Sequence, residues 1–140
     1  MDPLSIAAGV AGLITLTGQL SRSLVAYGKA AKREREDLQL LLTEVSLLQS
    51  LLQRLDSFLR SNGVANVTFH HTCALKASLA ICEETALDLN ERLGKLEAPR
   101  LSRAVERLKW PFSEKEVDRV LETLRRCTST FQFSLTLEGW

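Results

Sequence analysis

The chain has 140 residues, of which 45% are apolar and 25% charged, ordinary proportions for a single globular domain that covers residues 1–140 and buries a core. Its formal net charge of +1 lacks the basic excess of a nucleic-acid binder, so we expect no nucleic-acid partner. Its three cysteines have no metal-ligand spacing, which argues against a zinc site and favours reduced thiols in an intracellular protein.

The first predicted helix begins at the N-terminus. Asp2 is a suitable N-cap, and the fixed φ of Pro3 suits the first helical position. Apart from Asp2, the first twenty-one residues have no charged side chain. A helix from Pro3 to about Leu20 would be roughly 27 Å long, just short of the roughly 30 Å of a bilayer hydrocarbon core. We expect it to continue to about Ala31, with Gly28 as a weak point.

The two faces of this helix differ in side-chain size more than in polarity. At about 100° per residue, large aliphatic side chains gather on one face and small ones on the other. Small residues four positions apart, Ala8 with Gly12 and Ala11 with Thr15, match the spacing that lets helices approach closely in membranes. The aliphatic face comprises Ile6, Val10, Leu13, Ile14, Leu16, Leu20 and Leu24, and the small face also includes Ala7, Gly18 and Gln19.

Two interpretations of this segment stay open, and both can hold in different states of the protein. One is a core helix of a soluble bundle, with small residues where a neighbouring helix lies close. The other is a segment that enters a membrane, although its glycine and hydroxyl side chains make it a poor constitutive transmembrane span. It is also a poor secretory signal, because it lacks a basic n-region.

Apolar residues recur every three or four positions along two further segments. The second predicted helix begins within the charged residues 32–37 and ends near Arg60. A loop at 64–71 precedes the third helix, whose apolar seam runs from Leu75 to Leu96. Beside its main seam the second helix has another apolar stripe, so we expect it to be apolar over a wide arc and central in the fold. That stripe comprises Leu40, Leu47, Leu51 and Phe58.

The fourth predicted helix has the clearest local signature. Ser113 and Glu116 match a capping box, and Phe112 and Val117 match a hydrophobic staple. The proline before them separates this helix from a short predicted helix at 100–108, which we expect to brace the bundle. Four long helices with short connections predict an all-α fold, a four-helix bundle with an additional short brace helix.

The sequence has no motif of an enzyme or of a phosphate-binding loop, so we expect no catalytic residue, no cofactor and no metal. His70, His71 and Cys73 come nearest to a metal site, but structural zinc usually needs four ligands in paired spacings. The sequence therefore favours a binding or interaction module.

A basic cluster follows the uncharged segment. Lys29, Lys32, Arg33 and Arg35 suit anionic lipid headgroups, at about 1 kcal/mol each near a charged surface. Neighbouring acidic residues partly cancel these charges, so a solvated helix surface is the alternative interpretation.

Two stretches of sequence carry a resemblance to a known family. The opening MDPLSIAAGVAGL, read with LKWPFSEKEV at 108–117, resembles the N-terminal HeLo-like domain of fungal STAND proteins, which are NLR-like receptors. The resemblance spans residues 1 to about 137. It implies a bundle similar to the four-helix domain of the mixed-lineage kinase domain-like pseudokinase. In such receptors a nucleotide-binding domain of the same chain follows and is an expected partner.

The resemblance implies an effector function. On activation such domains cluster as homo-oligomers, and the first helix leaves a cytoplasmic bundle for the plasma membrane and causes cell death. A non-toxic helical oligomerisation or adaptor module is the alternative. The residues expected to enter a membrane, with anionic lipids as partners, are Leu4, Ile6, Val10, Leu13, Ile14 and Leu16, and those expected to associate with other copies are Ala8, Ala11, Gly12 and Thr15.

Overall fold

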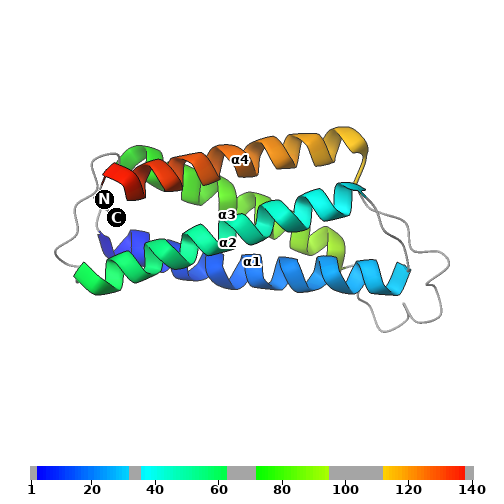
Figure 1. Ribbon diagram of the computed structural model, residues 1–140, viewed down its shortest axis with the longest axis horizontal. Helices are drawn as coiled ribbons and strands as arrows, with labels where there is room; N and C mark the ends of the chain where they lie inside the picture. Colours follow the sequence, from blue (N-terminus) through cyan, green and yellow to red (C-terminus); the bar gives the residue numbers. More distant parts are fainter. Residues whose placement is uncertain (1–2, 32–35, 63–71, 95–111, 138–140) are drawn as a thin grey trace.

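A computed structural model describes residues 3–31, 36–62, 72–94 and 112–137, and these residues form four α-helices with no strand among them. The helices are α1 (Pro3–Ala31), α2 (Glu36–Asn62), α3 (Thr72–Gly94) and α4 (Glu114–Leu137). They lie side by side along one long axis (Figure 1). The predicted all-α fold and its four-helix bundle are confirmed, while the predicted brace at 100–108 and the loop at 64–71 lie outside the described residues.

Each helix occupies one corner of the bundle. Helix α1 packs against α2 and α3, and α4 packs against the same two helices, so α1 and α4 lie at opposite corners. Helix α1 runs antiparallel to α2 and parallel to α3, and α4 runs antiparallel to α3 and parallel to α2 (Figure 1). Helix α1 therefore has two neighbours and one outward side.

Leucine is the commonest residue of the core, and Phe131 of α4 is its largest fully buried side chain. The apolar stripe that predicted a central α2 is buried only in part. Leu51 and Phe58 are buried, but Leu40 is 42% exposed and Leu47 is 53% exposed. The expectation of a central α2 is wrong, because a corner helix has two neighbours and its apolar arc is wider than the surface that they cover.

Helix α1 begins at Pro3 and continues through Gly28 to Ala31. A Cβ atom at Gly28 would lie 3.1 Å from a Leu38 methyl carbon, so the absence of a side chain lets α2 approach closely there. The expected weak point is therefore a site of tight packing, since helical backbone and neighbouring helix both continue past it.

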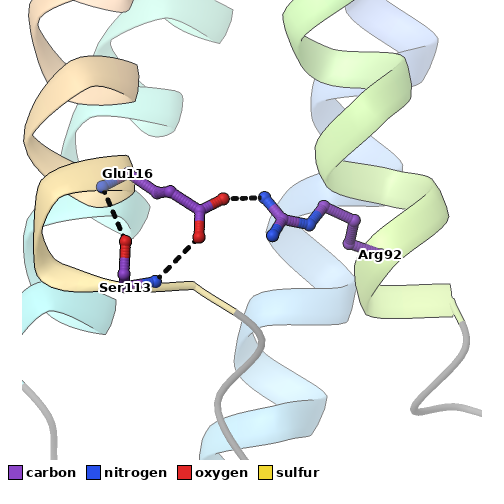
Figure 2. A network of polar contacts seen from close by, with 3 residues as sticks. All are labelled: Arg92, Ser113 and Glu116. Atoms are coloured by element: carbon purple, nitrogen blue, oxygen red, sulfur yellow. Dashed lines mark hydrogen bonds and ion pairs between the residues drawn. The ribbon is translucent and has the colours of Figure 1, made fainter.

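The capping box of α4 is formed as predicted (Figure 2). The Ser113 hydroxyl accepts a hydrogen bond from the Glu116 N–H at 3.1 Å, and the Ser113 N–H donates to Glu116 Oε1 at 3.1 Å. Phe112 and Val117, the residues of the predicted hydrophobic staple, are both buried in the core. These local contacts fix the first turn of α4.

Glu116 also joins α4 to α3. Its second carboxylate oxygen forms an ion pair with the Arg92 guanidinium (Figure 2), which lies 4.7 Å from the centre of the Phe112 ring. The hydrogen bonds from Arg92 and from the Ser113 backbone lower the pKa of Glu116 from 4.5 to about 2. The ionised form is therefore favoured in the folded state, and its contribution to stability is present above about pH 4.5 and is lost as the pH falls towards 2.

We predict that Glu116→Gln reduces the loss of stability between pH 4.5 and pH 2, because glutamine has no proton to bind in that range. The measurement is the free energy of unfolding from urea denaturation at several pH values. Glu122→Gln is the matched control, since Glu122 pairs with Arg126 on the exposed surface of the same helix. If Glu116→Gln loses as much unfolding free energy between pH 4.5 and pH 2 as the wild type does, the lowered pKa does not belong to Glu116.

Candidate membrane-binding helix

The aliphatic face of α1 is turned into the bundle. Ile6, Val10 and Leu13 are at most 1% exposed, and Ile14 and Leu16 lie half-buried at the edges of this face. Further along the helix Leu20, Leu24 and Tyr27 are buried as well. The side chain of Leu4 lies outside the described residues. Five of the six residues predicted to meet lipid therefore pack, wholly or partly, on the core in this state.

The small face of α1 is turned outward. Ala8, Ala11, Gly12 and Thr15 are all exposed, and a Cβ atom at Gly12 would meet nothing within 4 Å. The expectation that a neighbouring helix lies close to these small residues is wrong for this group, because they occupy the outward side of a corner helix. Close approach occurs instead at Gly18, where a Cβ atom would lie 3.3 Å from Gln49 Nε2.

The outward face of α1 is also free of ionisable groups over its first five turns. The first charged side chain along the helix is Arg22, which is exposed, and the next is Lys29, also exposed. The other predicted headgroup ligands, Lys32, Arg33 and Arg35, lie outside the described residues. The described part of the basic cluster thus follows the uncharged stretch, towards the C-terminal end of α1.

Across the described helices, the polar contacts seen between α1 and its neighbours are few. The Asn90 side-chain amide of α3 donates a hydrogen bond to the Leu16 carbonyl at 3.2 Å. The buried hydroxyl of Thr17 donates to the Leu13 carbonyl of its own helix at 2.8 Å, so this hydrogen bond does not join α1 to another helix. Among the residues that the structure describes, no ion pair joins α1 to another helix.

The interhelical ion pairs of the described chain both involve α4. Arg92 of α3 pairs with Glu116, and the buried carboxylate of Glu44 in α2 lies 3.4 Å from Arg125 Nε. Helix α4 is therefore joined to each of its neighbours by an ion pair, while α1, at the opposite corner, depends on apolar packing.

The strength of this packing follows from the buried side chains. Burying one large apolar side chain contributes about 1.5–3 kcal/mol, so detaching the six buried apolar residues of α1 into water would cost on the order of 10 kcal/mol. Hydrocarbon or another apolar surface could replace these contacts, because dispersion and the hydrophobic effect are not directional. A buried ion pair could not be replaced in this way.

Sequence reasoning missed two residues of this interface. Thr17 lies four positions after Leu13, so helical spacing alone places it on the aliphatic face. Asn90 lies 74 residues from its partner Leu16, and no local pattern connects them.

Among the described residues no helix has both the length and the hydropathy of a membrane span, and no group of side chains suits a metal ion. The candidate metal residues His70, His71 and Cys73 have no described side chains.

The fold defines a class of protein, the all-helical bundle domains. Comparison with known families matches residues 1–137 to the family described as pigment biosynthesis cluster protein PigL, N-terminal. The chain belongs to this family, PigL_N, the N-terminal domain of a fungal pigment cluster protein. Neither a curated protein nor a solved structure gave a significant match.

Adjacent substitutions on the two faces of α1 test how the helix is packed. We predict that Leu13→Ala lowers the free energy of unfolding by about 2–5 kcal/mol, because it leaves a cavity in the core. Gly12→Ala should raise it by up to about 1 kcal/mol, because the new methyl group meets open space and alanine is the better helix former. Urea denaturation followed by circular dichroism measures both values. Similar small effects at both positions would show that α1 is not packed as described.

Proposed function

We propose that this chain is a membrane-targeting, cell-death-inducing effector domain of a fungal NLR-like receptor, of the HeLo-like type that its sequence resembles. It would act by oligomerisation and by insertion of α1 into a membrane. The observation that carries the proposal is that α1 has no charged side chain over residues 3–21 and no ion pair to another helix among the described residues. Such a helix can exchange one apolar environment for another.

In the proposed resting state the aliphatic face of α1 is buried against α2 and α3, and the domain stays in the cytoplasm. Clustering of several receptors raises the local concentration of the domains and gives α1 other copies to pack against. Ile6, Val10 and Leu13 would then face lipid. A single inserted helix would leave the polar side chains of Thr15 and Gln19 in hydrocarbon. In an oligomer, the small face of each α1 can lie against another copy or against water.

Charge at the far end of α1 fits the same arrangement. Lys29 is exposed, and its sequence neighbours Lys32, Arg33 and Arg35 carry three further positive charges. Each basic side chain near an anionic leaflet contributes about 1 kcal/mol. The proposed lipid partners at the plasma membrane are therefore anionic, and the downstream nucleotide-binding domain would supply the clustering.

The exposed small face also favours a second function, a non-toxic helical oligomerisation or adaptor module. Ala8 with Gly12, and Ala11 with Thr15, present two small-residue pairs that another helix could approach closely in water as well as in lipid. In this case α1 would stay in the bundle and the small face would bind a second copy.

We predict that Ala11→Glu lowers dye release from anionic liposomes by roughly a hundredfold. The new carboxylate is exposed in the folded bundle, whereas an acidic side chain near the bilayer centre costs about 2.5–3.5 kcal/mol. Ile6 and Leu13 are unsuitable for this test, because a charge in the core would unfold the domain.

The matched control is Ala80→Glu, which places the same charge on an exposed alanine of α3. It should leave dye release unchanged, and circular dichroism should show both variants folded. Equal dye release by the two variants would contradict insertion of α1.

The adaptor function makes a different prediction for Gly12→Leu. A bulky side chain at this exposed position should abolish self-association measured by light scattering while the bundle stays folded, because it prevents close helix approach. Gly12→Ala is the control and should retain self-association. If wild-type protein associates in solution and releases no dye from liposomes, the adaptor function replaces the effector function.

A further inference from the structure

Two cysteines on different helices lie together in the seam between α3 and α4. Cys82 of α3 is 1% exposed and Cys127 of α4 is 3% exposed, and both are free thiols. The Cys127 thiol donates to the Ser78 carbonyl, with Sγ and the oxygen 3.6 Å apart. Because Ser78 and Cys82 lie one helical turn apart on the same side of α3, this contact places the two sulfur atoms side by side.

The two thiols perturb each other's titration. Their interaction raises the pKa of Cys82 and lowers the pKa of Cys127. Burial acts further to raise the pKa of Cys82. Of the two, Cys127 is therefore the better nucleophile and Cys82 is the group that stays protonated beside it.

We propose that Cys82 and Cys127 are an oxidisable dithiol that forms a disulfide between α3 and α4 on exposure to a peroxide. The inference rests on the arrangement of the two side chains across an antiparallel helix pair, and it is independent of any action at membranes. Cys73 takes no part, because its position at the start of α3 is nine residues, or about 13 Å along a helix, from Cys82.

The reaction proceeds in two balanced steps. The Cys127 thiolate attacks one oxygen of hydrogen peroxide, the O–O bond breaks, and sulfenic acid and hydroxide form. The Cys82 sulfur then attacks the sulfenic sulfur, the S–S bond forms, the S–O bond breaks, and the departing oxygen leaves as water with the Cys82 proton. In total two thiols lose two electrons and one peroxide becomes two water molecules.

Access to the pair depends on small movements of the α3–α4 seam. A surface groove of about 480 Å³ runs between these helices and ends at Thr123, one helical turn before Cys127. Because both sulfur atoms are buried, oxidation has to wait for local opening and should be slower than that of an exposed thiol.

The disulfide would join α3 to α4, the helix at the corner opposite α1. It closes the chain between residues 82 and 127 into a loop, which restricts the unfolded chain more than the folded one. Helix α1 contacts α3 on a different side and gains no covalent bond. Oxidation should therefore stabilise the bundle and leave the candidate membrane-binding helix attached by the same apolar contacts.

The experiment treats the folded domain with hydrogen peroxide, blocks remaining thiols with an alkylating reagent in denaturant, and digests with trypsin. Cleavage after lysine and arginine separates the three cysteines into peptides 61–76, 77–92 and 127–140. We expect peptides 77–92 and 127–140 to be joined, with a mass two hydrogens below their sum. The melting temperature should rise by about 5–10 °C and return to its original value with a reductant.

Cys73→Ser should behave as wild type, and Cys82→Ser should lose both the linked peptides and the shift in melting temperature. The wild type and the Cys73 variant decide the result even if the Cys82 variant folds poorly. The proposal would be overturned if Cys82 and Cys127 were both fully alkylated after peroxide treatment. A disulfide that includes peptide 61–76 would also overturn it.

Discussion

The resting bundle and its proposed activity both depend on one constraint, the absence of ionised groups from the first five turns of α1. Residues 3–21 carry no charge, and in the described part of the chain they pack on α2 and α3 through leucine, isoleucine and valine side chains, with an amide hydrogen bond from Asn90. Apolar contacts of this kind are strong in sum and can be exchanged for any other apolar surroundings. A single buried carboxylate on α1 would bind the helix to one partner.

The opposite corner of the bundle is held differently. Helix α4 begins with a capping box, buries Phe112 and Val117 at its start, and forms ion pairs with both α2 and α3. The cysteine pair adds a position at which α3 and α4 can be joined covalently. Directional contacts are thus concentrated on α4, whereas non-directional contacts dominate on α1. This asymmetry suits a domain in which one helix changes partners while the others stay together.

Local features of this fold could be predicted from the sequence because their causes are local. Pro3 and the Ser113–Glu116 pair mark helix starts, and the spacing of Ile6, Val10 and Leu13 predicts which side of α1 is buried. The arrangement of the helices could not be predicted in this way. Asn90 and Leu16 are 74 residues apart, and Glu44 and Arg125 are 81 residues apart, so their contacts depend on which helices become neighbours. The exposure of Leu40 and Gly12 depends on the same arrangement.

Movement of α1 from the bundle into lipid can be detected by lipid-quenching fluorescence. A small fluorophore is attached at position 14, on the edge of the aliphatic face, and separately at position 80 on α3, with the native cysteines replaced by alanine. Both proteins are clustered on anionic liposomes that contain brominated acyl chains. Insertion of α1 should give strong quenching at position 14 and little at position 80. Equal, weak quenching at the two positions would rule out insertion of α1.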